Sequence, residues 1–287
     1  MTRPEYLNKG DFIGIVAPAR KINPEEIRDF KEAAYRWGFK IITGKYLFDS
    51  HHQFSGTDDQ RIEDFQQMID NPRVKAIFCA RGGYGSARIH QKINFRIFEK
   101  EPKWVAGFSD ITVFHSYLNK FAGIETLHSL MPYSFSKEHD AESESSLYQA
   151  LTGQPLSYTF DSNPLNKNGN AEGILTGGNL SMLYSLNGTV YFPDLNNKIL
   201  FIEDVDEYLY HIDRMMMNFH LSGVLKKVKA VVVGGMTNMN DNDIPFGKTA
   251  EEIIANTLAE YNIPYCFNFP AGHGSENQTL IFGRSAT

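Results

Sequence analysis

Short apolar runs alternating with helical patterns dominate the first half of this sequence, and they constrain its fold more than any other feature. Buried strands are expected at residues 11–19, 39–47, 74–80 and 104–108, and the main helices at residues 24–38, 58–72 and 110–123. In the first helix, Asn23 suits the cap, Pro24 the first position and Gly38 the stop. This order predicts an α/β unit with a largely parallel sheet. Ligands collect at the carboxyl ends of such strands, where RGGYG and FSD lie.

A polar stretch at residues 134–170, rich in Ser and Asn, interrupts this alternation and predicts a linker between two domains. After it, apolar strand patterns return at residues 198–205, 229–235 and 265–272, with helical patterns between them. We therefore expect an N-terminal α/β domain at residues 1–135, a linker region at residues 136–170 and a C-terminal domain at residues 171–287.

Charge and composition exclude several classes of protein. The 287 residues carry a net charge of −6, which argues against non-specific binding to nucleic acid or to an anionic membrane. No apolar stretch approaches the length of a membrane span, and MTRPEYLNKGDF contains no apolar segment typical of a secretory signal. Cys79 and Cys266 form neither a CxxC pair nor a disulfide framework, which fits a reducing compartment. We expect a soluble cytoplasmic protein.

The stretch WVAGFSDIT, residues 104–112, places a serine at the end of a predicted strand. Gly107 allows a sharp turn, and the free amides of the following helix would point at whatever Ser109 attacks. Two interpretations remain open from this stretch alone. Ser109 is either a nucleophile or an ordinary helix cap. The stretch is not the hydrolase elbow G-x-S-x-G, because Ile111 occupies the second glycine position.

A serine nucleophile needs a base, and the sequence contains nine histidines. His273 differs from the others because it follows an apolar strand and stands between Gly272 and Gly274, where the backbone can approach a ligand closely. An ordinary turn histidine is the alternative. Of the others, His51 and His52 lie in a polar loop, His90, His115, His211 and His220 lie in helical patterns, and His128 lies near the end of a short apolar stretch.

Three carboxylates compete as the group that orients the base. Glu203 is the first acid after the apolar run KILFI, and strand alternation places Asp204 on the opposite face from Glu203. Asp110 would lie in the first helical turn, where its side chain diverges from that of Ser109. We interpret Asp110 as a backbone amide donor and a favourable charge at a helix N-terminus.

The glycine loop ARGGYGSAR, residues 80–88, matches neither a Walker A loop nor G-x-G-x-x-G, since Arg88 occupies the third glycine position. It is either a turn whose amides face an anion or oxyanion, or an ordinary strand-to-helix turn. No HExxH motif or clustered Cys/His spacing predicts a metal site.

Taken together, the ordered motifs ARGGYG, GFSDIT, TGGNLS, FIEDVDEYLYHIDRM, VVVGG and GHGSEN resemble those of the LD-carboxypeptidase family, over about residues 10–283. The resemblance implies a catalytic triad of Ser109, His273 and Glu203. It also implies an oxyanion hole formed by the amides of Asp110 and Gly83, with no metal and no cofactor.

The same resemblance implies a fold, a reaction and an assembly. The fold would be an α/β one: a parallel-sheet, flavodoxin-like N-terminal domain joined to a smaller, β-rich α/β C-terminal domain, with the site between them. The reaction would release the terminal D-Ala from muropeptide tetrapeptides in peptidoglycan recycling, and the protein would be a cytoplasmic homodimer. The alternative is the related microcin C immunity branch, which cleaves a peptide–nucleotide antibiotic.

The sequence departs from the family pattern in two places. Ala19 and Arg20 replace a small Ser-containing turn after the first strand, and relatives usually continue into closing strands beyond IFGRSAT, where this sequence ends.

Overall fold

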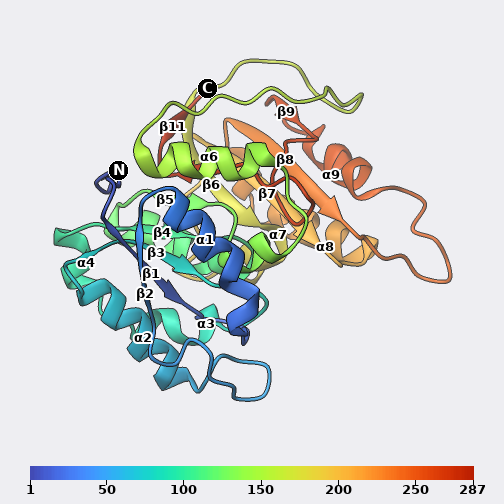
Figure 1. Cartoon of the computed structure of the whole chain (residues 1–287). Coiled ribbons are helices and arrows are strands. Elements are labelled where there is room, and N and C mark those ends of the chain that lie inside the picture. The colour runs from blue at the N-terminus through green and yellow to red at the C-terminus, as the bar shows by residue number, and fades with distance from the viewer.

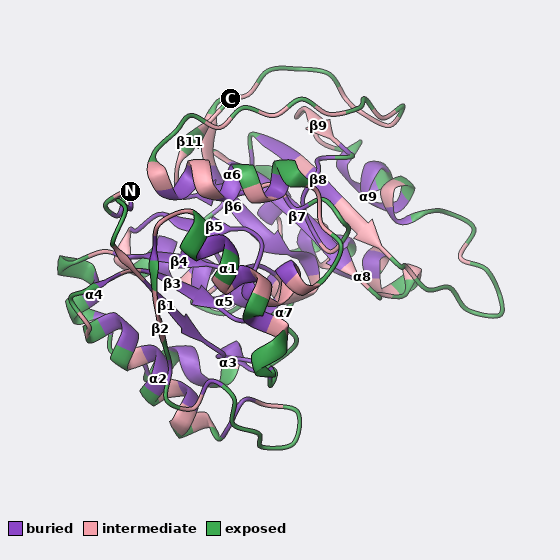
Figure 2. Ribbon diagram, in the orientation of Figure 1, coloured by how far each residue is buried: buried purple, intermediate pink, exposed green.

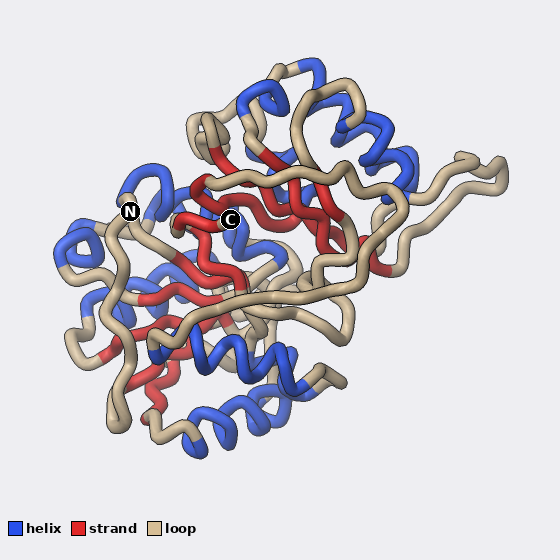
Figure 3. Tube along the Cα trace, turned by 90° about the horizontal axis from the view of Figure 1, so that it is seen from above, coloured by secondary structure: helices blue, strands red, loops and turns tan.

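The computed structural model describes all 287 residues and places two sheets side by side (Figures 1 and 3). The first sheet has the strand order β10-β5-β4-β3-β1-β2. Its strands are β1 (Phe12–Val16), β2 (Lys40–Thr43), β3 (Val74–Cys79), β4 (Trp104–Ala106), β5 (Thr126–His128) and β10 (Leu280–Phe282). All neighbours are parallel except β10, which pairs antiparallel with β5. The expected α/β architecture is therefore confirmed.

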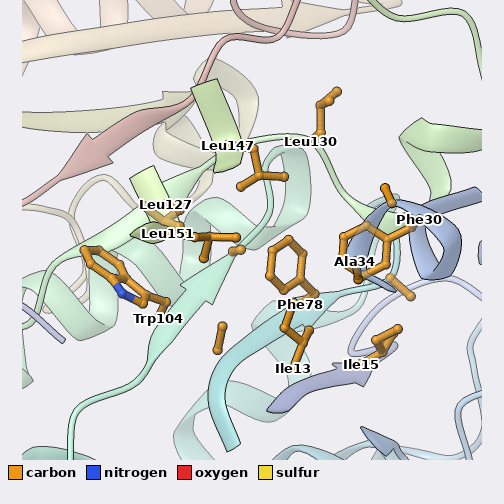
Figure 4. Packing of buried hydrophobic residues seen from close by; sticks show 14 of the residues in the cluster. Ile13, Ile15, Phe30, Ala34, Phe78, Trp104, Leu127, Leu130, Leu147 and Leu151 are labelled. Atoms are coloured by element: carbon orange, nitrogen blue, oxygen red, sulfur yellow. The ribbon is translucent and has the colours of Figure 1, made fainter. Parts of the chain in front are cut away.

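Helices cover both faces of the first sheet because its strands are apolar on both sides. On one face, α1 (Arg28–Arg36) and α6 (Ala141–Thr152) pack on the sheet, with Phe30 of α1 and Leu147 of α6 against Ile13, Phe78 and neighbouring residues (Figure 4). The other face carries α2 (Asp58–Asp70), α4 (Arg96–Lys100) and α5 (Thr112–Tyr117). The short helix α3 (Ser86–Ile89) follows the glycine loop.

The second sheet has the order β11-β6-β7-β8-β9. Its strands are β6 (Gly173–Asn179), β7 (Lys198–Val205), β8 (Ala230–Thr237), β9 (Tyr265–Cys266) and β11 (Ser285–Ala286), of which only β11 is antiparallel to its neighbour. One face packs against α7 (Leu180–Leu186), α8 (Leu209–Leu221) and α9 (Ala250–Leu258). The buried strands and the exposed outer helix faces are distinguished in Figure 2.

The stretch predicted as a linker contains a helix that belongs to the first core. Helix α6 occupies residues 141–152 of that stretch, and Leu147, Ala150 and Leu151 are buried under the first sheet. The chain then crosses to the second sheet and returns at β10. Phe201 of β7 packs between the two sheets, where it contacts both Phe282 of β10 and His128 of β5.

No helix is both long enough and apolar enough to span a membrane.

Candidate active site

The turn after β4 holds Ser109 in an unusual backbone conformation. Gly107 has a φ of 154° and Ser109 a φ of 63°, a left-handed value that is uncommon for a residue with a side chain. Ser109 opens the 3-10 helix η3 (Ser109–Ile111), which runs into α5, but no side-chain capping hydrogen bond forms there. The helix-cap interpretation of Ser109 is therefore wrong. A partly exposed serine held in a strained turn is the arrangement expected of a positioned nucleophile.

The glycine loop lies directly against this serine. A Cβ on Gly82 would come within 2.8 Å of Ser109 Cβ, 2.9 Å of its Oγ and 3.5 Å of the Asp110 amide nitrogen. Position 82 therefore has to be glycine if Ser109 is to stay where it is. The carbonyl of Gly82 accepts a hydrogen bond from the Arg20 amide at 3.4 Å. The next amide, that of Gly83, therefore points away from Arg20 and has no backbone partner.

Glu203 and His273 meet at the carboxyl end of the second sheet. Glu203 is fully buried near the end of β7, and its Oε2 lies 2.6 Å from His273 Nδ1. Because a carboxylate only accepts, Nδ1–H is the donor, which leaves Nε2 free to take a proton. Gly272 makes this approach possible, since a Cβ there would stand 3.1 Å from Glu203 Oε2.

The environment of His273 sets its proton affinity. Burial is the largest single influence and acts to lower the pKa of His273, but the acidic side chains around the ring, Glu203 foremost, together outweigh it, and the pKa is raised above 6.5. Asp204 and Asp206 add to the negative potential around the ring. The imidazole is thus a stronger base than an ordinary histidine, and it keeps 17% of its side chain exposed.

Phe108 connects the two halves of the site. Its ring lies 4.8 Å from the ring of His273, centroid to centroid, and it immediately precedes Ser109. Ser109 itself makes no hydrogen bond to His273 in this structure, and catalytic hydrogen bonds are often long before substrate binds. The structure thus joins Glu203 and His273 directly, and brings them to Ser109 through Phe108.

Two family models together match most of the chain. Residues 13–129 match the model of the LD-carboxypeptidase N-terminal domain, and residues 172–287 match that of the LD-carboxypeptidase C-terminal domain. The chain belongs to the LD-carboxypeptidase family. A probable murein peptide carboxypeptidase of Bacillus subtilis is 33% identical over 288 residues, covering 99% of this chain and 90% of the relative.

More distant relatives also match over almost the whole chain. The murein tetrapeptide carboxypeptidase of Pseudomonas aeruginosa is 26% identical over 96% of this chain and 92% of its own length. The crystal structure of a muramoyltetrapeptide carboxypeptidase from Oxalobacter formigenes superposes with a TM-score of 0.87 at 29% identity, covering 96% of this chain and 93% of that one. The microcin C7 self immunity protein MccF has the same fold, with a TM-score of 0.87 at 23% identity over 98% of this chain and 94% of its own.

The other two candidate acids point elsewhere. Asp204 accepts hydrogen bonds from Asn179 Nδ2 and the Ser181 amide, both at 2.8 Å, on the opposite side of β7 from His273. Burial, and then the charge of Glu203, raise the pKa of Asp204 to about 7. Asp110 is buried and accepts from the Ser86 amide at 2.8 Å, so its side chain anchors α3. Glu203 is the acid that reaches the histidine.

Two buried histidines support the turn from behind, and sequence reasoning did not find this role. His115 Nε2–H donates to the carbonyl of Gly107 at 2.8 Å, and burial lowers the pKa of His115 to about 4. His128 lies between the rings of Phe108, Phe201 and Phe282, and burial lowers its pKa well below 6.5. Both rings are therefore neutral at ordinary pH and act as packing groups.

The second sheet also contacts α5, the helix that follows Ser109, through the TGGNLS motif. Gly178 packs so closely on Thr112 that a Cβ would lie 2.4 Å from its Oγ1, and the Asn179 amide donates to the same oxygen at 3.0 Å. The repeated glycine in the motif was the available signal for this contact. These two contacts fix the end of β6 relative to α5. Because Asn179 of β6 pairs with Glu203 of β7, they also fix the position of Glu203.

No group of three or more His, Cys, Asp or Glu side chains is arranged to hold a metal ion. A cavity of about 790 Å³ lies between residues 153–169 and the second sheet, and none of the site residues lines it. A second one, of about 560 Å³, borders the histidine loop at Gly274, Ser275 and Glu276.

Proposed function

We propose that this peptidase is a serine carboxypeptidase that hydrolyses the amide bond between an L-configured centre and a C-terminal D-amino acid. Muropeptide tetrapeptides that lose their terminal D-Ala are the proposed substrates. The observation that carries the proposal is the buried Glu203–His273 pair at 2.6 Å, packed through Phe108 against the strained turn of Ser109. The names of the relatives from Bacillus and Pseudomonas support the choice of murein peptides.

In the proposed mechanism, His273 Nε2 takes the proton of Ser109 as Oγ attacks the scissile carbonyl carbon. Glu203 keeps Nδ1 protonated and stabilises the imidazolium that forms. The amides of Gly83 and Asp110 are proposed to donate hydrogen bonds to the developing oxyanion. The imidazolium then protonates the departing D-Ala nitrogen. Water, activated by the same histidine, hydrolyses the acyl-enzyme and restores Ser109.

The test is incubation of the purified protein with defined tetrapeptides carrying lysine or diaminopimelate at the third position, read by mass spectrometry for loss of D-Ala. Ser109→Ala should abolish release, with the fold intact by circular dichroism, and a chelator should have no effect. Release by the Ser109→Ala variant at the wild-type rate would contradict the serine mechanism. Activity lost in EDTA and restored by zinc would indicate a metallopeptidase.

A parallel assay addresses the immunity branch of the family. An aminoacyl-sulfamoyl adenylate, offered under the same conditions, should be left intact. If it were cleaved while the tetrapeptides were not, the chain would belong functionally with the antibiotic-cleaving peptidases.

A further inference from the structure

The following inference rests on the proposed function. It starts from the acidic side chains around His273, which give this side of the site a negative potential. Glu203, Asp204 and Asp206 all bear on His273 electrostatically. A carboxypeptidase substrate ends in a free carboxylate, separated from the scissile nitrogen by a single carbon. The negative potential repels that carboxylate, so a cation has to receive it from the opposite side, where the glycine loop lies.

Arg20 is placed on that side. The chain leaves β1 through buried Pro18 and Ala19, and Arg20 is the first exposed residue. A Cβ on Gly83 would lie 3.0 Å from Arg20 Cβ and 3.3 Å from its Cδ. The adjacent residue, Gly82, is the one in contact with Ser109. Arg20 and Ser109 therefore contact neighbouring residues of one turn, whose Cα atoms are about 3.8 Å apart.

The guanidinium of Arg20 is also free, unlike those of the other arginines around the loop. Arg81 stacks on Tyr133 at 4.0 Å and faces Glu26 at 3.7 Å. Arg61 and Arg88 both pair with Asp58. Arg20 takes part in no ion pair, and its only hydrogen bonds to the protein are made by its backbone.

We propose that Arg20 receives the terminal carboxylate of the substrate and so makes the enzyme specific for a free carboxyl end. The planar guanidinium can donate two parallel hydrogen bonds to a carboxylate, a geometry that lysine cannot reproduce. Its stem lies along Gly83, whose amide is proposed to bind the oxyanion. Holding the carboxylate there would place the scissile carbonyl over the same turn.

The experiment is a double-mutant cycle between the protein and the substrate. The wild type, Arg20→Met and the matched control Lys21→Met, the next residue and also an exposed cation, are each given a tetrapeptide acid and the same peptide as its C-terminal amide. The wild type should prefer the acid by about 10- to 100-fold in kcat/KM, as expected for a charge-assisted pair. Arg20→Met should lose this preference by losing activity on the acid alone, and Lys21→Met should keep it.

Binding to an inactive background separates recognition from chemistry. In the Ser109→Ala protein, adding Arg20→Met should weaken binding of the acid and leave binding of the amide unchanged. Arg20→Met that retained the full preference for the acid would overturn the role of Arg20 while leaving the proposed function in place. A wild type that cleaved neither peptide would overturn both.

Discussion

Replacement of Glu203 by glutamine tests the centre of the site. The change keeps the size of the side chain and removes its charge, so the imidazolium that forms during catalysis loses its partner. The two groups are joined at 2.6 Å and Glu203 is fully buried. For charges centred about 4 Å apart at an effective dielectric constant of about 20, the lost attraction is about 4 kcal/mol. This corresponds to about 10³-fold in kcat, within the range of roughly 10²–10⁴ expected for an orienting acid.

The pH profile gives the same variant a second signature. The base must be neutral to accept a proton, so the acid limb of kcat/KM in the wild type should lie above pH 6.5, because the pKa of His273 is raised. In Glu203→Gln the raising charge is gone while burial remains. The residual activity should therefore have its acid limb at lower pH than the wild type.

The matched controls are Asp204→Asn and Asp110→Asn. Both acids are buried, but their partners are Asn179 and Ser181 for one and Ser86 for the other. Each control should affect stability more than turnover, and should cost less activity than Glu203→Gln. The assay is kcat/KM on one tetrapeptide, with folding checked by circular dichroism. A near-wild-type Glu203→Gln beside a crippled Asp204→Asn would refute the assignment.

Three other changes probe the support of the site. Gly82→Ala should lower kcat by about 10²-fold, because the added Cβ would displace Ser109. Gly10→Ala is the control and should leave kcat unchanged, because nothing lies within 4 Å of its added Cβ. Equal kcat for the two variants would contradict the close contact between Gly82 and Ser109. The pKa of His115 is lowered to about 4, so acidification from pH 6.5 towards pH 4 should protonate this histidine in the unfolded chain but not in the folded one. The free energy of unfolding should therefore fall by roughly 3 kcal/mol over this range through His115 alone. In urea unfolding, His115→Gln should lose less stability over the same pH range. A fragment of residues 1–150 should hydrolyse nothing in the tetrapeptide assay, and any hydrolysis would show that the acid and base are dispensable.

Strands β1 to β4 of the first sheet were predictable because each is a short apolar run closed by turn residues. The side on which Glu203 points was also predictable, since alternation along a strand is local geometry. The left-handed φ of Ser109 was not, because it depends on how Gly82 and the buried His115 crowd the turn. The contact between the rings of Phe108 and His273 was also not predicted, because His273 lies in a loop far along the sequence from Phe108.

The return of β10 to the first sheet was the largest feature beyond sequence reasoning. Leu280–Phe282 is only three residues long and follows an irregular loop, so no periodicity marks its partner. Its pairing with β5, more than 150 residues earlier, is set by packing of Phe282 against His115 and His128. Long-range pairing of this kind is decided by the assembled core and not by local pattern.

This pairing also sets the order in which a growing polypeptide becomes an enzyme. During translation the strands around Ser109 emerge first, but the β5 edge has no neighbour until β10 (Leu280–Phe282) leaves the ribosome. An open edge invites association with other chains, so the nascent protein depends on rapid completion or on chaperones. The histidine loop emerges only just before β10. The Glu203–His273 pair and the closed sheet therefore form at nearly the same stage of synthesis.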